Sequence, residues 1–409
     1  MKYITKLLHA INNCLIPKLS KSYFECTTHV EFDVRNDNLD KNFEQLMQCL
    51  KDLTLENNDE APTIISSLYI LYQELKCDGP WNNDKTNEYS KKLNITFEVL
   101  AAVSLERVIQ KSTFNVQEIF DKCLEELNCK LTSDDFKKYP GLIEVYCNLL
   151  ADVTEYNVKL KPEKIFPMLL LLIDDYILIN KMKGLVCCMK TLGCMKKQDF
   201  DGGNYYEVLY RSLKRVFLEK DLNITGSTHI CLIELCNLFP DYIKYDKMDN
   251  MYSGILQQLS IESNIYRRAE CLKFARYLLR THGINCLSRG SLRTIICDCL
   301  ELCTNDTVAN VILMDTLAVL DEWTTQCWCV WQLSSDHKII STLLKVLYTC
   351  KEQKFAAHIQ RLIIILICLN NENERKQLMA CLDKADTICN DTFKTRIFEL
   401  KYLYSKIQF

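Results

Sequence analysis

Apolar residues recur at helical spacing along most of the chain from about residue 95 onward. One such set occupies positions i, i+3, i+4, i+8 and i+11 of a single segment: Phe97, Leu100, Ala101, Leu105 and Val108. Similar spacing recurs in three later segments: 265–279, 309–320 and 340–347. Residues spaced in this way share one face of a helix, and no segment alternates with period two for long enough to predict a strand. The pattern therefore predicts an all-α protein.

The most apolar stretch lies near the middle of the chain, where an unbroken apolar run occupies residues 166–173. Asp174, Asp175 and Tyr176 end this run, and a second apolar stretch follows. The run is too short to span a bilayer, which requires about 20 residues. We therefore expect a buried helix with Leu170 in the core, a tight polar turn and a second buried helix. Such a pair cannot bury its faces alone, so other helices must stack on both sides of it.

Short polar breaks separate the predicted helices. They lie at 199–204, 239–241, 282–285, 304–306 and 334–336, and the second contains Pro240, which cannot continue a helix. Grouped in twos, the helices begin new pairs near these positions: 163, 203, 246, 285, 334 and 371. A spacing of roughly 40 residues is typical of HEAT and armadillo repeats. The sequence therefore predicts a HEAT/armadillo-like α-solenoid of stacked antiparallel helix pairs, with a globular helical bundle as the alternative.

The beginning of the chain differs from the rest in composition. After an initial amphipathic helix, residues 26–60 are acidic and rich in Asn, with one short helical patch at Phe43–Leu50. Residues 77–90 carry Gly, Pro and Asn and predict a loop. We therefore divide the chain into an N-terminal helical segment with acidic, partly flexible loops, residues 1–90, and the solenoid, residues 91–409.

Composition narrows the class of protein. There are only 10 Gly and 7 Pro in 409 residues, and a fold built on tight hairpins or glycine-rich phosphate loops would need more of both. The formal net charge of −3 gives no overall attraction to nucleic acid or to an anionic membrane. We therefore expect neither of them as a direct partner.

The 23 cysteines predict core packing rather than disulfide or metal chemistry. Disulfide frameworks belong to short secreted chains. The polar residues His9, Asn12 and Asn13 interrupt the apolar part of the N-terminus, so it does not resemble a signal peptide. Structural zinc needs paired knuckles of cysteines, whereas Cys299 and Cys303 are spaced as on one helix. We expect a reducing, intracellular environment and no bound metal.

The sequence contains no recognisable catalytic constellation. It lacks the glycine-rich nucleotide motifs, the H-E-x-x-H metalloprotease motif and the G-x-S-x-G nucleophile motif. The six histidines are scattered, and none has a second histidine at helical spacing. We therefore expect a protein that is not an enzyme, with no catalytic residues and no cofactor.

Asp174 and Asp175 are the best candidate for an acid pair. Neighbouring residues on a helix point about 100° apart, so the two carboxylates should not share a proton. Two interpretations remain open. The pair can end a helix and brace the turn within this chain, or it can cap the turn and contact a partner.

Two other clusters have a structural explanation as their first interpretation. Arg267–Arg268 and the other short basic runs lack interleaved aromatic residues, so they fit solvated helix faces better than a nucleic-acid track. Trp323, Trp328 and Trp331 predict an aromatic core contact between neighbouring repeats, with an exposed binding hot spot as the alternative.

The central block resembles the signature of a known family. The run Phe166–Tyr176, followed by Asn180–Gly184, is similar to the apolar run, Asp-Asp-Tyr, Asn-Lys and Gly of the Tti-two family. That family is the third subunit of the TTT complex, named for its Tel-two, Tti-one and Tti-two proteins. Further similar points follow in order along residues 160–330: Cys231–Pro240, Tyr266–Ala269, Gly283–Ile284 and Trp323.

The resemblance implies a HEAT-like adaptor without catalytic activity, found in the cytoplasm and also in the nucleus. It implies direct binding to a Tti-one homologue and, through it, to a Tel-two homologue. The assembly works with heat-shock chaperones and the R2TP machinery to mature and stabilise phosphatidylinositol-kinase-like kinases, including those of target-of-rapamycin signalling and the DNA damage response. The candidate partner-binding residues lie in the matching segments: Asp174, Asp175, Tyr176, Asn180, Lys181, Gly184, Arg267 and Arg268.

Another class of function stays open beside this one. A HEAT/armadillo-type trafficking or transport adaptor would also be a helical solenoid, and it would bind cargo peptides. Such an adaptor usually carries a ladder of exposed Trp and Asn at repeat spacing, whereas this chain has a single Trp cluster. A helical enzyme is the third class, and the missing catalytic constellation argues against it.

Overall fold

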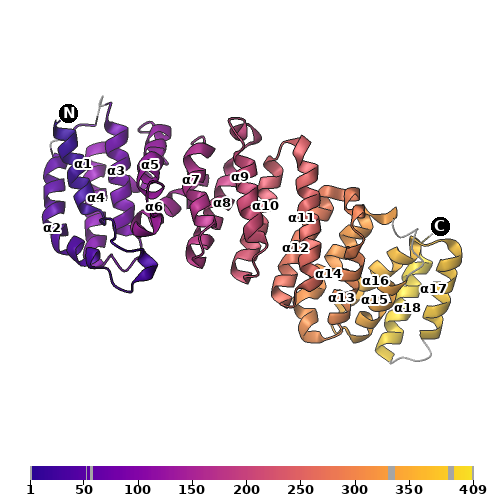
Figure 1. Ribbon diagram of the computed structural model, residues 1–409. Coiled ribbons are helices and arrows are strands. Elements are labelled where there is room, and N and C mark those ends of the chain that lie inside the picture. Colours follow the sequence, from indigo (N-terminus) through magenta and orange to yellow (C-terminus); the bar gives the residue numbers. More distant parts are fainter. Residues whose placement is uncertain (1, 52, 56–58, 330–336, 386–390, 408–409) are drawn as a thin grey trace. The chain divides into compact units, whose positions relative to one another are not determined.

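A computed structural model describes residues 2–51, 53–55, 59–329, 337–385 and 391–407, and its regular structure is helical throughout (Figure 1). The described residues form these α-helices: α1 (Lys2–Cys14), α2 (Val30–Lys51), α3 (Ala61–Lys76), α4 (Asp84–Ala101), α5 (Val116–Leu131), α6 (Pro140–Ala151), α7 (Pro162–Ile173), α8 (Leu178–Cys194), α9 (Tyr205–Phe217), α10 (Leu222–Leu238), α11 (Asp241–Ile261), α12 (Ile265–His282), α13 (Ser291–Leu302), α14 (Asp306–Gln326), α15 (Lys338–Thr349), α16 (Gln353–Cys368), α17 (Glu372–Ala385) and α18 (Asp391–Ser405). Six short 3-10 helices join them: η1 (Tyr23–Glu25), η2 (Leu105–Arg107), η3 (Phe136–Lys138), η4 (Val153–Glu155), η5 (Lys197–Phe200) and η6 (Gly283–Ser288). The helices pack in neighbouring pairs, which confirms the predicted α-solenoid.

The helices form two compact units. One unit contains residues 1–218 and 230–238, and the other contains 219–229 and 239–409, so that α10 contributes to both. The boundary expected at residue 90 falls within α4, and the division into residues 1–90 and 91–409 stays a prediction.

The first unit is built in two layers. Helices α3, α5, α7 and α9 pack one against the next in the first layer. In the second layer α6 packs against α8, while the pairs α3–α4, α5–α6 and α7–α8 join the two layers. The second layer is interrupted between α4 and α6, where η2 packs on α3 and α4 instead.

The second unit repeats the same packing. Helices α11, α13 and α15 follow one another in one layer, and α12, α14, α16 and α18 follow one another in the other. The pairs α11–α12, α13–α14 and α15–α16 join the layers. Each helix thus buries its apolar stripe against a partner in its own pair and against the next pair, as a solenoid requires.

Polar side chains mark where helices begin. Asn83 accepts hydrogen bonds from the backbone N–H groups of Lys85 and Thr86 and forms a capping box, while Asn264 caps α12 in a related way. The predicted breaks at 239–241 and 304–306 fall between helices. The predicted break at 334–336 lies outside the described residues.

The acidic segment near the N-terminus is more helical than predicted. Instead of one short patch, α2 runs through 22 residues. Its buried positions, including Phe32, Leu39, Phe43 and Leu46, follow helical spacing, whereas its many Asp and Asn side chains face away from the core. These polar residues have low helix propensity, and tertiary packing overrides it. The loop predicted at 77–90 is correct only as far as Asn83, because α4 begins directly after this capping residue.

A second correction concerns the helical pattern at 97–108. Helix α4 ends at Ala101, and Ala102 takes a left-handed conformation with φ of 55°. Leu105 and Val108 are nevertheless buried, because η2 turns them back toward the core. Leu105 and Val108 are therefore buried as predicted, although they do not belong to the same helix as Phe97.

Cysteines contribute to the core in both units. Most of the described cysteines are buried, and none of them forms a disulfide. Within the described ranges, no group of three or more His, Cys, Asp or Glu side chains is arranged to hold a metal ion. Among the same residues, no helix is both long and apolar enough to cross a membrane.

Candidate partner-binding site

The central block has the predicted helix–turn–helix arrangement. Helix α7 ends at Ile173, the turn occupies residues 174–177, and α8 follows at Leu178. The core position predicted for Leu170 is only partly correct, since Leu170 is half-buried while its neighbour Leu169 is fully buried.

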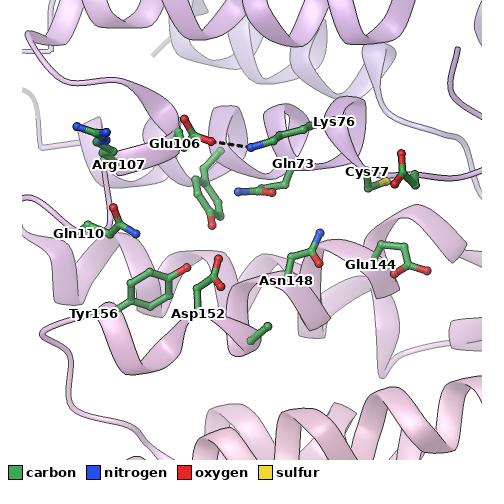
Figure 2. Close-up of a pocket in the computed structure, with 13 residues that line it drawn as sticks. Gln73, Lys76, Cys77, Glu106, Arg107, Gln110, Glu144, Asn148, Asp152 and Tyr156 are labelled. Atoms are coloured by element: carbon green, nitrogen blue, oxygen red, sulfur yellow. Dashed lines mark hydrogen bonds and ion pairs between the residues drawn. The ribbon is translucent and has the colours of Figure 1, made fainter. Parts of the chain in front are cut away.

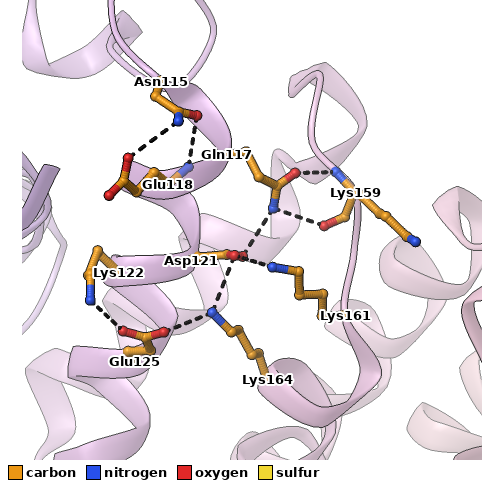
Figure 3. A network of polar contacts seen from close by, with 9 residues as sticks. All are labelled: Asn115, Gln117, Glu118, Asp121, Lys122, Glu125, Lys159, Lys161 and Lys164. Carbon is orange, nitrogen blue, oxygen red and sulfur yellow. Dashed lines mark hydrogen bonds and ion pairs between the residues drawn. The ribbon is translucent and has the colours of Figure 1, made fainter. Parts of the chain in front are cut away.

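A polar network fastens the start of α7 to α5 (Figure 3). Asp121 binds Lys161 and also lies 3.2 Å from the amine of Lys164. Glu125 binds Lys164 at 2.8 Å, and Gln117 exchanges hydrogen bonds with the backbone of Lys159. These contacts set the direction in which α7 leads to the turn.

Asp175 is buried and braces the turn from inside. One of its oxygens, Oδ1, lies 2.9 Å from Nζ of Lys137 in η3. The other, Oδ2, accepts a hydrogen bond of 2.7 Å from the amide of Asn180, and Oδ1 also accepts from the backbone N–H of Ile177 at 3.3 Å. Burial lowers the pKa of Lys137, but the hydrogen bond and charge of Asp175 outweigh this effect and leave the pKa raised.

Asp174 contacts a different neighbour. Its carboxylate accepts hydrogen bonds from Oγ of Ser212 at 2.6 Å and from Nη2 of Arg215 at 2.7 Å, both in α9. Asp175 thus binds η3 and α8, whereas Asp174 binds α9, and the two adjacent carboxylates do not form a dyad. These contacts match the interpretation in which the pair braces the turn within this chain.

Tyr176 is the exposed member of the block. Its side chain is 77% exposed, and Nζ of Lys137 lies 3.9 Å from the centre of its ring. The same lysine thus binds buried Asp175 and supports exposed Tyr176 through a cation–π contact. The ring is held in place and remains accessible.

The remaining predicted residues of this block are buried in α8. Asn180, Lys181 and Gly184 all face neighbouring helices. A Cβ atom on Gly184 would lie 2.8 Å from Cβ of Leu172 and 2.9 Å from the backbone nitrogen of Ile173. Glycine at this position therefore permits the close approach of α7 and α8.

The two predicted arginines belong to α12, in the second unit. Arg267 is buried and binds Glu262 and Gln258; its Nε donates to Thr225 at 3.2 Å. Arg268 is half-buried, and its guanidinium donates to the backbone oxygen of Glu262. These side chains are engaged in holding the end of α11 to α12.

An exposed apolar stripe on α8 is the feature that the sequence did not reveal. Ile179, Met182 and Val186 are 54%, 41% and 42% exposed and follow helical spacing, and the exposed Tyr176 lies just before them in the turn. We call these four residues the α8 stripe. The opposite side of the helix is apolar as well, with Leu185 among its buried residues, so periodicity alone could not tell which side is covered.

The α8 stripe offers a partner an exposed apolar surface, whereas most of the eight predicted partner-binding residues are buried. Contiguous exposed apolar side chains on a folded protein commonly mark an interaction site. Of the eight residues predicted to bind a partner, only Tyr176 is prominently exposed, while Asp174 and Arg268 are partly accessible. Partner binding by all eight stays a prediction.

Part of the chain is similar in sequence to a known protein. No family model matches the chain. A stretch of 168 residues is 26% identical to TELO2-interacting protein 2 of Rattus norvegicus and covers 41% of this chain. The match spans 33% of that protein's length. It provides a modest link to the family that the central block resembles.

A comparison of structures adds no functional information. A crystal structure of an engineered protein aligns with 99% of this chain and with 96% of its own chain, at 11% sequence identity. The TM-score is 0.47, and at this level the likeness carries no argument. The chain is thus an all-helical protein with a modest sequence similarity to a TELO2-interacting protein.

Proposed function

We propose that this protein is a non-catalytic scaffold subunit of a TTT-like co-chaperone complex. It binds Tti-one and Tel-two homologues and, with heat-shock chaperones and the R2TP machinery, helps to mature and stabilise phosphatidylinositol-kinase-like kinases. The observation that carries the proposal is the sequence similarity to TELO2-interacting protein 2. The all-helical fold supports it, because stacked helix pairs provide long surfaces for protein partners. The proposed location is the cytoplasm and the nucleus.

The α8 stripe is the proposed contact with the first of these partners. Ile179, Met182 and Val186 offer an apolar ridge, and Tyr176 adds an aromatic ring whose position Lys137 supports. Aromatic and apolar side chains at the centre of an interface contribute most of its binding energy. The buried carboxylate of Asp175 acts indirectly, by fixing the turn from which the stripe begins.

The proposal is tested by purifying the tagged chain from its native cells and identifying bound proteins by mass spectrometry. Homologues of Tti-one and Tel-two should co-purify with the wild-type chain. The double variant Ile179→Asp, Met182→Asp should recover them at a level lower by roughly tenfold or more, because two charges replace apolar contacts.

The matched control is the double variant Ile95→Asp, Val99→Asp. These residues are also exposed and apolar, at 62% and 82%, but they lie on α4. The control should retain the partners, and both double variants should melt within a few degrees of wild type. Recovery of a set of transport cargoes in place of the TTT homologues would establish the alternative trafficking role and overturn this proposal.

A further inference from the structure

A polar trough lies in the first unit, at the interruption of its second layer (Figure 2). Helix α6 packs on α3 and α5, whereas α4 packs on α3 and η2. One side of α3 is therefore left uncovered between α4 and α6. The resulting cavity has a volume of about 720 Å³, which lies within the range of ligand-binding pockets.

The two walls of the trough present side chains at regular spacing. On α3, Tyr69, Gln73 and Lys76 lie one helical turn apart. On α6 and its continuation, Glu144, Asn148 and Asp152 are spaced by four residues. Figure 2 shows the second row facing the first across the open space, with Asp152 near Tyr156 at one end and Glu144 near Cys77 at the other.

Two tyrosines, Tyr69 and Tyr156, form the floor of the trough. Tyr69 is 3% exposed and is hydrogen-bonded to Tyr156. Burial raises the pKa of both hydroxyl groups, so both remain protonated at neutral pH. The floor therefore contributes shape, while the charge of the trough comes from its rims.

Some of the charged side chains on the rims are already paired. Lys76 binds Glu106 at 2.6 Å, and Glu144 binds Lys183 of α8. Gln110 donates to Glu155 at 2.6 Å. These contacts hold the side chains of the rims in place.

Four other polar side chains of the trough are not engaged. Within the part of the chain that the structure describes, Asp78, Asp152, Arg107 and the amide of Asn148 make no side-chain hydrogen bond or ion pair. Four carboxylates line the trough against two cations, and one of these cations, Lys76, is held by Glu106. The unpaired groups are therefore two carboxylates against one cation, Arg107, together with one amide that can both donate and accept, so the trough keeps an excess of acceptors for a cation.

We propose that this trough binds an extended, basic segment of a partner protein. Asp152 and Asp78 pair with Lys or Arg side chains of the segment, because an unpaired carboxylate at the edge of a concave site favours a charge-assisted hydrogen bond. The amide of Asn148 hydrogen-bonds the segment's backbone, which offers a donor and an acceptor at every residue. The polar rims give an apolar segment little surface to bury.

This inference goes beyond the scaffold role and does not depend on it. The trough is formed by α3, α6, η2 and η4, whereas the contact proposed for the co-chaperone partners lies on α8. Loss of one binding activity should leave the other intact, so the two proposals can fail separately.

The test is fluorescence anisotropy on the full chain with a labelled short peptide of alternating lysine and glycine. The peptide should bind and should weaken as salt is added, whereas the matched glutamate–glycine peptide should not bind. Asp152→Asn and Asn148→Ala should each weaken binding by roughly tenfold. Spermine, a polycation without a peptide backbone, should be insensitive to Asn148→Ala.

Glu163→Gln is the matched control, because Glu163 is exposed on α7 and its substitution changes the net charge by the same amount as Asp152→Asn. The control should bind the lysine peptide as wild type does. Equal weakening by Glu163→Gln would show attraction to an acidic protein in general and would overturn the proposal. Absence of lysine-peptide binding, or equal binding of the glutamate peptide, would overturn it as well.

Discussion

The buried carboxylate of Glu74 illustrates how much a single residue can couple this fold to pH. It lies in α3 with no exposed surface, and its Oε1 accepts a hydrogen bond of 2.8 Å from the backbone N–H of Ile16. Burial raises the pKa of Glu74 to about 7, although the charge of Arg35 and the hydrogen bond from Ile16 oppose the rise. Glu74 therefore binds the segment that follows α1 to α3, and the free energy of burying its carboxyl group depends on pH.

The sign of this dependence follows from the raised pKa. Between the ordinary pKa of a glutamate, about 4.5, and 7, the folded state binds more protons at Glu74 than the unfolded state does. The contribution of Glu74 to stability is therefore complete below this window and is lost as the pH rises through it. In Glu74→Gln this contribution is absent.

We predict that the free energy of unfolding of Glu74→Gln, minus that of wild type, increases from pH 4.5 to pH 7 by up to roughly 3 kcal/mol. Urea unfolding of both proteins across this range measures the difference, and it cancels groups that titrate equally in the two proteins. A flat difference for Glu74→Gln would show that its carboxyl group does not titrate abnormally.

At the scale of elements, the two carboxylates in the turn between α7 and α8 should differ in how much they stabilise the fold. Asp175→Ala removes a buried acceptor of three donors and leaves Lys137 without its ion pair, so we expect a loss of stability of roughly 2–3 kcal/mol. Asp174→Ala removes a hydrogen bond from Ser212 and an ion pair with Arg215, whose side chain is 70% exposed. Loss of this exposed ion pair should lower the free energy of unfolding by less than about 1 kcal/mol, in addition to the effect of the lost hydrogen bond.

Thermal melting of the two single variants, alongside pull-down of a Tti-one homologue from the same preparations, distinguishes bracing from partner contact. Bracing predicts that Asp175→Ala loses stability before or together with binding. If Asp175→Ala melted like wild type but no longer bound the partner, the carboxylate would have to be accessible, which its burial contradicts.

At the scale of the whole molecule, burial predicts how fast each cysteine reacts. Burial raises the pKa of thiols in both units, for example to about 12 for Cys14 and Cys271. The thiolate is the reactive form, so buried thiols should react slowly. Cys129 and Cys381 are exposed and should differ from the rest.

We expect iodoacetamide at pH 8 to alkylate Cys129 and Cys381 in the native protein and to spare the buried cysteines until the chain is unfolded. Peptide mass spectrometry before and after denaturation identifies the modified positions. A chelator or a mild reductant should leave the melting temperature unchanged. A stoichiometric zinc ion in the purified protein, or rapid native alkylation of Cys14, would contradict the assignment of the cysteines to the core.

Much of the fold could be predicted because helix formation and helix ends are encoded locally. The spacing around Leu272 and Ala275 indicated one helix, and Pro240 marked a break between two others. Local signals failed where tertiary packing opposed them. Helix α2 is longer than predicted, because its many polar residues favour a loop whereas its buried apolar residues are sufficient to anchor a helix.

The candidate site was less predictable than the fold. The central block was located correctly as a helix–turn–helix, but most of its notable polar residues proved to be buried. Arg267 was expected on a solvated face, and it is instead covered and bound by Glu262 and Gln258. A charged side chain can be buried when such partners meet it, and these partners come from another helix.

The sequence by itself determined the helical class, the positions of most breaks and the block that resembles the Tti-two family. These properties depend on residues within a few turns of one another. Only the tertiary structure decided which side of α8 stays exposed, where Asp174 and Asp175 point, and that α4 and α6 leave a trough on α3. The physical reason is that an apolar or charged residue is compatible with several surroundings, and the helices packed against it select one.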